Sequence, residues 1–578
     1  MQRQAVLHVM AVVLGCAALF PACSGSGGSS DAQANELPGD SAVMDAAGDL
    51  AQPDVQEVPD VLDALEDTLP VDVVEASDAG GQDVFPPNKL PFEFTRKPKG
   101  DPIPAEETLA FTRKVTGMWK KVDYFRWLLR TSSGVDASSG MADYLAWHND
   151  VTAVKSGDTV TFRQDGLEHN MWIPGSKILS QALNGCVLTG DWTICKVAEQ
   201  YCKGLTAVVK GFIWDEDDPA PFLMARSVFP PDQSFTMDEG TWQDDGRKKA
   251  VQFSTAYKVE DGWNAHSFAW PHNPTWGSMW VTNMRSKDDV CAIVRTTTFL
   301  PYAQLAPYEW VQDACKETMD NMVGFNKDIV EYGYYIRTKG TDGKAYVFTD
   351  QDLGSYVWYV TFDPLNECTN RLATDLIAYQ APQVNEFVND CGKGYPSLYE
   401  QVAVQGHYYN YPIVWNYHMA ALGNALVYGY ADLAKGLLEG MADRMDDYLA
   451  TNTKEVGAKE AQWERDMAVL LVQAASMGLP LTSKEARIVQ KHWNAAADEL
   501  TAWPRWDLWD PAVPDGEYNG GSGFRPPDTD TGVPIEAVAM LIEYCNSPFK
   551  NPAGETFVDC SIVGDLSKWG EEEQGGAL

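Results

Sequence analysis

Residues 24–88 contain no lysine and no arginine, and this feature divides the chain into two kinds of sequence. The same stretch carries 15 aspartate and glutamate residues, and it has no aromatic side chain between residues 31 and 83. A segment with low hydrophobicity and charge of one sign cannot bury enough apolar surface to offset the entropy of ordering. We therefore predict a disordered acidic linker over residues 23–90, which leaves residues 91–578 to form the folded domain.

A short apolar run precedes this linker. It covers residues 5–20, follows the basic Arg3, and is interrupted only by His8 and by small residues. A bilayer crossing needs about 20 apolar residues, so this run is too short to be a membrane helix. Its length fits the apolar core of a secretory signal peptide. The sequence therefore predicts export, with residues 1–22 as the signal.

The end of the apolar run predicts how the exported protein is anchored. Phe20-Pro21-Ala22-Cys23 is followed by a Gly/Ser-rich stretch, and together they resemble the lipobox of bacterial lipoproteins. The resemblance implies that Cys23 is lipidated and begins the mature chain, and Ser24 in place of Asp favours the outer membrane. That family prefers Leu where this chain has Phe20. An ordinary cleaved signal, which would give an extracellular protein, therefore remains the alternative.

The charge of the whole chain limits its partners. With 82 acidic and 44 basic residues, the net charge is −38 and the pI is near 4.4. Nucleic-acid binding needs clustered Lys and Arg, so no nucleic acid is expected as a partner. An anionic lipid surface would repel the same charge, and no later stretch is long and apolar enough for a membrane helix. Membrane attachment is therefore expected only through the lipid.

Apolar residues at intervals of three and four predict that the folded domain is mainly helical. Residues 191–212 show this spacing most clearly, as one buried helix face requires. Thr482 and Glu485 have the spacing of a capping box at the start of another helix. The same periodicity predicts helices over residues 106–130, 286–300, 308–325, 369–390, 413–449 (two helices or one kinked helix), 459–477, 482–500 and 534–544.

Strand-like sequence is sparse and local. Residues 335–348 predict a hairpin around Thr341-Asp342-Gly343, because a Gly-containing turn separates two runs rich in aromatic residues. Further short segments rich in Val, Thr and aromatic residues predict strands over residues 159–163, 223–229, 251–257, 346–349 and 356–362. The fold class is therefore predicted as mainly α with small β inserts.

Many helices joined by aromatic loops fit few architectures, among them arrays of helical hairpins. Lys210-Gly211-Phe212 ends one predicted helix and leads into the acidic loop over residues 213–218, and Trp-rich loops follow other helices. These features resemble the six-hairpin (α/α) toroids of many carbohydrate-active enzymes. The resemblance implies an (α/α) toroid and a carbohydrate-active function, although such toroids also serve other chemistries.

Nine cysteines remain after Cys16 and Cys23, and in an exported protein they are expected to form disulfides. Short loops between neighbouring cysteines favour the pairs Cys291–Cys315, Cys368–Cys391 and Cys545–Cys560. The first three of the nine would then supply one further pair and one unpaired thiol. Those three are Cys186, Cys195 and Cys202.

Glycoside hydrolysis needs two carboxylates, and aromatic faces can position the sugar rings. Three loops combine acidic with aromatic residues. The first contains Trp214, Asp215 and Glu216; the second contains Trp503, Trp506, Asp507, Trp509 and Asp510; the third covers residues 263–280 and leads to Asp288 and Asp289.

For each loop there is a structural alternative: a solvated acidic turn, a hydrophobic lid, or carboxylates that cap a helix. Under the catalytic hypothesis, Asp215 or Glu216 and Asp507 or Asp510 are the acid and the base. Trp214, Trp503, Trp506 and Trp509 would then bind sugar.

A fourth constellation suggests a lyase. Tyr411, Trp415 and His418 fall on one face of a predicted helix, and Asn416 lies between them. Polysaccharide lyases in helical toroids use similar residue types, so His418 is a candidate substrate-binding residue. The alternative is a buried His418 whose hydrogen bonds are satisfied within the core.

No metal site or cofactor is predicted. The chain has no CxxC, GxSxG, Walker-type or HExxH pattern, and Asp528-Thr529-Asp530 lacks the distal Glu of a complete calcium loop. The sequence therefore predicts an exported, lipid-anchored cell-envelope protein that acts on a poly- or oligosaccharide, foremost as a glycoside hydrolase. A polysaccharide lyase and a noncatalytic surface-binding lipoprotein are the alternatives.

Overall fold

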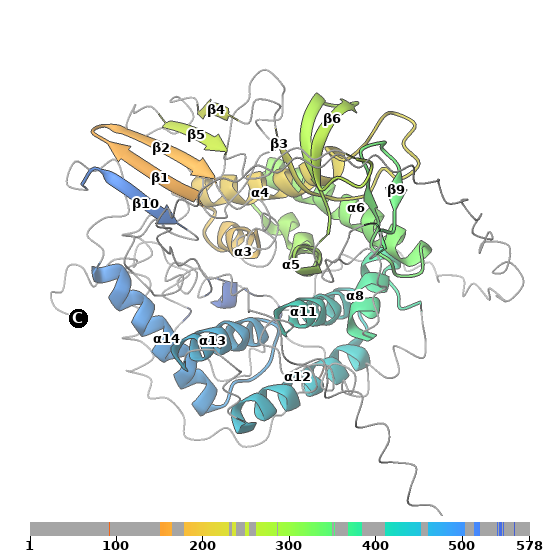
Figure 1. Ribbon diagram of the computed structural model, residues 1–578. Coiled ribbons are helices and arrows are strands. Elements are labelled where there is room, and N and C mark those ends of the chain that lie inside the picture. Colours follow the sequence, from red (N-terminus) through yellow and green to blue (C-terminus); the bar gives the residue numbers. More distant parts are fainter. Residues whose placement is uncertain are drawn as a thin grey trace, which may run out of the picture. The chain divides into compact units, whose positions relative to one another are not determined.

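The computed structural model (Figure 1) describes parts of the unit Val84–Leu578. The predicted signal peptide, the lipid on Cys23, the acidic linker and the predicted helix over residues 106–130 lie outside the described residues. The described residues are 92, 151–164, 179–229, 234–237, 249–253, 262–285, 287–349, 352, 368–383, 411–451, 460–502, 514–520, 540, 543–545, 547, 549 and 560.

Most of the described residues are helical, as the sequence predicted. Helix α4 (Trp192–Lys210) packs against α3 (Leu179–Thr189) on one side and against α6 (Glu309–Glu331) on another. The apolar residues that predicted α4 form its buried face. Helix α3 was not predicted from the sequence. Every residue from Leu179 to Cys186 is buried, so polar and apolar positions do not alternate with the helical period there.

Helix α11 (Tyr411–Val427) is buried almost all round, between α5 (Lys287–Thr296), α8 (Cys368–Tyr379) and α12 (Ala431–Thr451). A helix enclosed in this way is apolar on every side instead of on one stripe. Gly423 allows close approach, because a Cβ atom there would overlap the Thr298 side chain that follows α5. We refer to α3, α4, α5, α6, α8 and α11 together as the helical frame.

The segment over residues 413–449 forms two helices, α11 and α12, separated by a turn at Gly429. Helices α13 (Glu460–Ser476) and α14 (Ser483–Ala502) pack against each other. The capping box at α14 is confirmed. Thr482 N donates to Glu485 Oε2 at 2.8 Å, and Glu485 N donates to Thr482 Oγ1 at 3.3 Å. No described helix combines the length and the apolar character that a membrane crossing requires.

Three small sheets accompany the helices. The largest has the strand order β10-β1-β2-β5-β4, and all its neighbours are antiparallel except β2 and β5. Its strands are β1 (Val151–Ser156), β2 (Thr159–Gln164), β4 (Ser234–Met237), β5 (Lys249–Phe253) and β10 (Gly516–Gly520). The second sheet has the order β3-β7-β6 and contains β3 (Ala225–Phe229), β6 (Ser267–Asn273) and β7 (Gly277–Asn283).

The third sheet is the predicted hairpin, formed by β8 (Thr338–Lys339) and β9 (Ala345–Tyr346). The sequence did not predict strands β6 and β7, because their tryptophans also fit a ligand-binding loop. In the structure Trp270, Trp276 and Trp280 are buried. They therefore pack into the core, and of that loop's tryptophans only Trp263 is prominently exposed.

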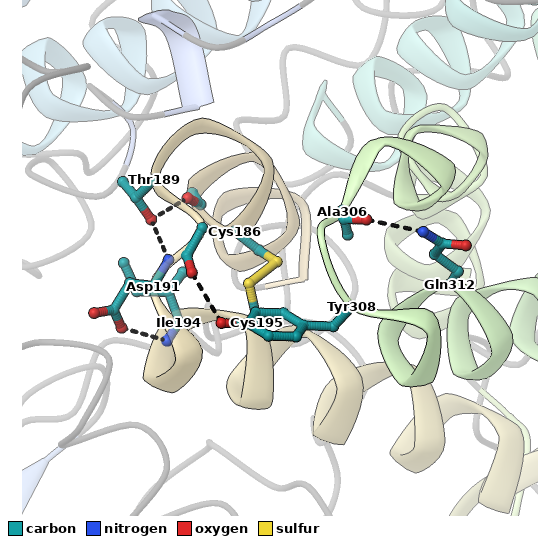
Figure 2. The surroundings of a disulfide bond; sticks show 10 residues. Cys186, Thr189, Asp191, Ile194, Cys195, Ala306, Tyr308 and Gln312 are labelled. Carbon is teal, nitrogen blue, oxygen red and sulfur yellow. Dashed lines mark hydrogen bonds between the residues drawn. A yellow bond between two sulfur atoms is a disulfide. The ribbon is translucent and has the colours of Figure 1, made fainter.

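A disulfide joins Cys186 of α3 to Cys195 of α4 (Figure 2). The turn between the two helices is held by side chains of its own. Thr189 Oγ1 accepts a hydrogen bond from Asp191 N, and Asp191 Oδ1 accepts one from Ile194 N at 3.1 Å. Asp191 therefore caps the start of α4, where the first backbone N–H groups lack helical partners.

The predicted Cys291–Cys315 pair is wrong: Cys315 of α6 is bonded to Cys202 of α4. Short loop length favoured the wrong pair, whereas the packing of α4 on α6 decides the actual one. Cys291 of α5 keeps a buried, reduced thiol, which accepts a hydrogen bond from Asn416 Nδ2 at 3.7 Å.

The predicted Cys545–Cys560 pair is confirmed. Cys368 is also disulfide-bonded, and its predicted partner Cys391 lies outside the described residues. Disulfides of this kind persist in oxidising compartments, so they indicate an exported protein.

Candidate functional site

Three segments that are far apart in the sequence meet at the β8–β9 hairpin. They are residues 214–218, residues 262–264 and residues 340–346, and we refer to them together as the hairpin site. Thr341 N donates to Trp263 O at 2.9 Å, and Thr341 Oγ1 donates to Gly262 O at 3.1 Å. The ring of Trp214 lies against Gly343. The structure thus brings the first acidic-aromatic loop and the start of the third together.

Two glycines of the hairpin make this contact possible. Gly343 has φ +78°, a conformation that L side chains rarely adopt, and a Cβ atom there would overlap the ring of Trp214. A Cβ atom on Gly340 would likewise overlap Trp263 O. Glycine is therefore required at both positions by close approach.

A buried ion pair joins Lys339 of the hairpin to Asp218. The two side chains are only 1% and 2% exposed. Lys339 Nζ also donates to Phe212 O at 2.8 Å, and burial lowers the pKa of Lys339 despite the attraction of Asp218. Asp218 Oδ2 accepts a hydrogen bond from Trp214 N at 2.7 Å. The pair thus ties the hairpin to the loop that carries Trp214.

Side chains of β6 hold the loop after α4 in place by hydrogen bonds. Asn273 Nδ2 donates to Lys210 O at 2.8 Å, and Asn273 Oδ1 accepts from Trp276 N at 2.8 Å. Trp270 Nε1 donates to Ile213 O at 3.0 Å. Buried backbone carbonyls need such partners, so these residues fix the course of the loop.

The rings of Trp263, Tyr346 and Phe348 all contact one another and form a small aromatic cluster. The Trp263 side chain is prominently exposed, with the residue 43% exposed, and its ring centroid lies 4.8 Å from that of Tyr346. Tyr346 stacks on Phe348 at 5.6 Å and 14°, and Phe348 is fully buried. The Arg285 guanidinium lies 5.2 Å from the centroid of Phe348. Trp263 is therefore an exposed ring with a rigid support.

Exposed carboxylates occur in two of the three segments of the site. Asp215, Glu216 and Asp217 are exposed, and Asp215 Oδ1 accepts a hydrogen bond from Asp217 N at 3.0 Å. Asp342 accepts from Tyr346 Oη at 2.7 Å. Partial burial by itself would raise the pKa of Asp342, but hydrogen bonds from Tyr346 and Lys344 outweigh it and lower this pKa. The Asp342 carboxylate is thus ionised and ready to accept further hydrogen bonds.

Of the residues that the sequence singled out, Trp214, Asp215 and Glu216 lie in the hairpin site. Trp214 is half-buried and makes edge contacts with Trp270 and His272 at 4.7 and 4.8 Å. The predicted residues Trp503, Trp506, Asp507, Trp509 and Asp510 lie outside the described residues, as does the segment over residues 528–532.

His418 lies elsewhere, on α11, and its side chain is fully buried. Burial lowers its pKa to about 3, although a hydrogen bond with the backbone of Leu437 acts in the opposite direction. Its ring stacks near Trp415, with centroids 5.9 Å apart. A side chain in this position has no contact with solvent, which matches the buried alternative.

Asp289 also has a structural partner. Its Oδ2 atom accepts a hydrogen bond from Arg226 Nε at 2.8 Å, and both side chains are buried. The pair joins the first turn of α5 to β3. The carboxylate is therefore part of a buried ion pair at the start of the helix.

Sequence reasoning did not assign a role to Asp342, Tyr346 or Lys339. The Asp-Gly turn and the aromatic residue after it predicted a hairpin but no binding role. Within the described residues, no group of three or more His, Cys, Asp and Glu side chains is placed to hold a metal ion. The chain matches no protein-family model, no curated protein and no solved structure.

Proposed function

We propose that this protein is exported to the cell envelope, is anchored there by a lipid on Cys23, and binds carbohydrate at the hairpin site. The observation that carries the binding proposal is the exposed Trp263 ring, which is backed by Tyr346, with the ionised carboxylate of Asp342 hydrogen-bonded to Tyr346. Binding sites for small polar ligands combine aromatic surface with a few placed polar groups.

The two kinds of residue suit a sugar for different reasons. The flat ring of Trp263 can cover the apolar C–H face of a pyranose, and its backing by Tyr346 means that little side-chain entropy is lost on binding. Sugar hydroxyls are donors, and the carboxylates of Asp215 and Asp342 are acceptors. The hairpin joins the segments that carry these two kinds of residue.

Glycoside hydrolysis is the second candidate function, and the carboxylates of the same site favour it. Asp342 is held ionised, as a base or nucleophile requires, and Asp215 and Glu216 lie in the neighbouring segment. An (α/α) toroid remains our proposal for the arrangement of the helices. The packing of α11 on α12 and of α13 on α14 supports helix pairs as its units.

Glycan binding is tested with the full-length protein in detergent and a panel of oligosaccharides, measured by calorimetry and by the release of new reducing ends. Trp263→Ala should weaken glycan binding about tenfold, or ~1.4 kcal/mol, because the stacking surface is lost. Trp192→Ala is the matched control, because Trp192 is 41% exposed but lies at the start of α4. Equal binding by both variants would contradict the proposal.

The anchor is tested by changing Cys23→Ser and separating membranes from soluble protein. The variant should leave the membrane fraction, because serine cannot carry the thioether-linked lipid that would anchor the mature chain. Retention of the variant in the membrane fraction would contradict lipidation at Cys23.

A further inference from the structure

The charge of the hairpin site is strongly one-sided. Its three segments contain five carboxylates and a single basic residue, Lys344. The charge of Asp218 is balanced by its buried ion pair with Lys339, whereas Asp215, Glu216 and Asp217 are exposed.

Lys344 does not balance this charge. Its Nζ atom lies 3.5 Å from Asp342 Oδ2, and its side chain is 75% exposed, so it compensates only that one carboxylate. The loop over residues 215–217 therefore presents its negative charge directly beside the half-buried ring of Trp214, and that ring contacts the same hairpin as Trp263.

We propose that the hairpin site selects glycans that carry no carboxylate or sulfate groups, and that it binds amino-sugar chains more tightly than neutral ones. This inference rests on the proposed carbohydrate-binding function and names the substrate class of that site. A uronate would bring its carboxylate beside three exposed carboxylates, and like-charge contacts of this kind are a means of rejecting a ligand. A protonated amino group would find acceptors in the same positions.

The proposal also separates the two enzymatic alternatives. Lyases of the kind that the region around His418 suggested act on uronate chains, which this site would repel. Any chemistry at the hairpin site is therefore expected on neutral or amino sugars. Because the carboxylates are exposed, the discrimination should weaken as salt screens them, within a Debye length of about 10 Å at 0.1 M.

The experiment compares three hexasaccharides, made of β-linked glucose, glucosamine or galacturonic acid, on the full-length protein in detergent at 20 and 300 mM NaCl. At low salt and pH 6, we expect glucosamine chains to bind at least tenfold more tightly than glucose chains. Galacturonic acid chains should not bind measurably. At high salt, the difference between the first two should shrink to about threefold or less.

A charge variant assigns the effect to the loop. The triple change Asp215→Asn, Glu216→Gln and Asp217→Asn should remove the preference for glucosamine, so that glucosamine and glucose chains bind within twofold of each other at 20 mM NaCl. Asp313→Asn with Asp320→Asn is the control, because both residues are exposed acids on α6. This control should keep the preference.

The outcomes separate the two proposals. If galacturonic acid chains bind as tightly as glucose chains, the charge selection is wrong and carbohydrate binding stands. An unchanged glucosamine preference in the triple variant also overturns the selection. If none of the three chains binds in a manner that depends on Trp263, the proposed function itself fails.

Discussion

The helical frame and the hairpin site differ in the balance of interactions that hold them together. In the frame, apolar faces pack at helical spacing, and the Cys202–Cys315 disulfide closes a sequence separation of 113 residues. On the loop-closure estimate, such a link stabilises the fold by about 5 kcal/mol, against about 3 kcal/mol for the short Cys186–Cys195 link. The hairpin site contains no cysteine and relies on an ion pair, amide side chains and two close-packed glycines.

The difference shows how a stable frame can carry an exposed binding surface. Apolar packing in the frame is non-directional and tolerates small changes, whereas buried polar contacts must all be satisfied together. The Lys339–Asp218 pair is placed where one hairpin meets one loop, so it controls the geometry of the surface above it. The comparison can be tested by removing one contact in each region.

The largest effect is expected at the buried ion pair. Lys339→Met leaves the Asp218 carboxylate buried without its partner, so it should lower the free energy of unfolding by about 3–5 kcal/mol. Lys344→Met is the matched control. That side chain is 75% exposed beside Asp342, so its loss should cost less than about 1 kcal/mol. Urea unfolding followed by circular dichroism measures both values.

A double variant separates loss of charge balance from loss of packing. Lys339→Met combined with Asp218→Leu removes both charges, and it should recover more than half of the stability lost in Lys339→Met alone. If Lys339→Met costs no more than Lys344→Met, the ion pair does not hold the hairpin site, and the contrast with the helical frame fails.

Local sequence patterns predicted the helices far better than the site. The apolar spacing of residues 191–212 predicted α4, and Thr482 with Glu485 predicted the start of α14, because both signals are local. Helix α3 was missed because its residues from Leu179 to Cys186 are all buried, which hides the period. The disulfide of Cys315 was mispredicted because chain separation says nothing about which helices pack.

The site was predictable only in part, for the same physical reason. The density of acidic and aromatic residues singled out Trp214 and Asp215. From its sequence context, however, Lys339 resembles an ordinary surface lysine. Nothing near it in the sequence shows that it pairs with Asp218, 121 residues away. The role of Gly343 depends in the same way on the ring of Trp214. Contacts of this range come from the folded chain and leave no local pattern.

A smaller effect is expected from two histidines, His418 in the helical frame and His266 next to the hairpin-site residues 262–264. The pKa of each is lowered to about 3. Burial is the largest cause for both, but the cations of Arg285 and Arg226 add to it at His266, whereas His418 is buried among the helices. Below about pH 6.5 the unfolded chain binds protons that the folded chain does not. Each histidine should therefore reduce stability as the pH falls from about 6.5 toward 3, by about 2 kcal/mol at pH 5.

Replacing each histidine should remove its share of this acid sensitivity. Between pH 7.5 and pH 5, His418→Gln and His266→Gln should each lose about 2 kcal/mol less unfolding free energy than the parent protein. Arg285→Gln tests the difference between the regions, since it should raise the pKa of His266, measured by NMR titration, and leave His418 unchanged. If His418 shifts by the same amount, the two sites are coupled, and the distinction between frame and hairpin site does not hold for their electrostatics.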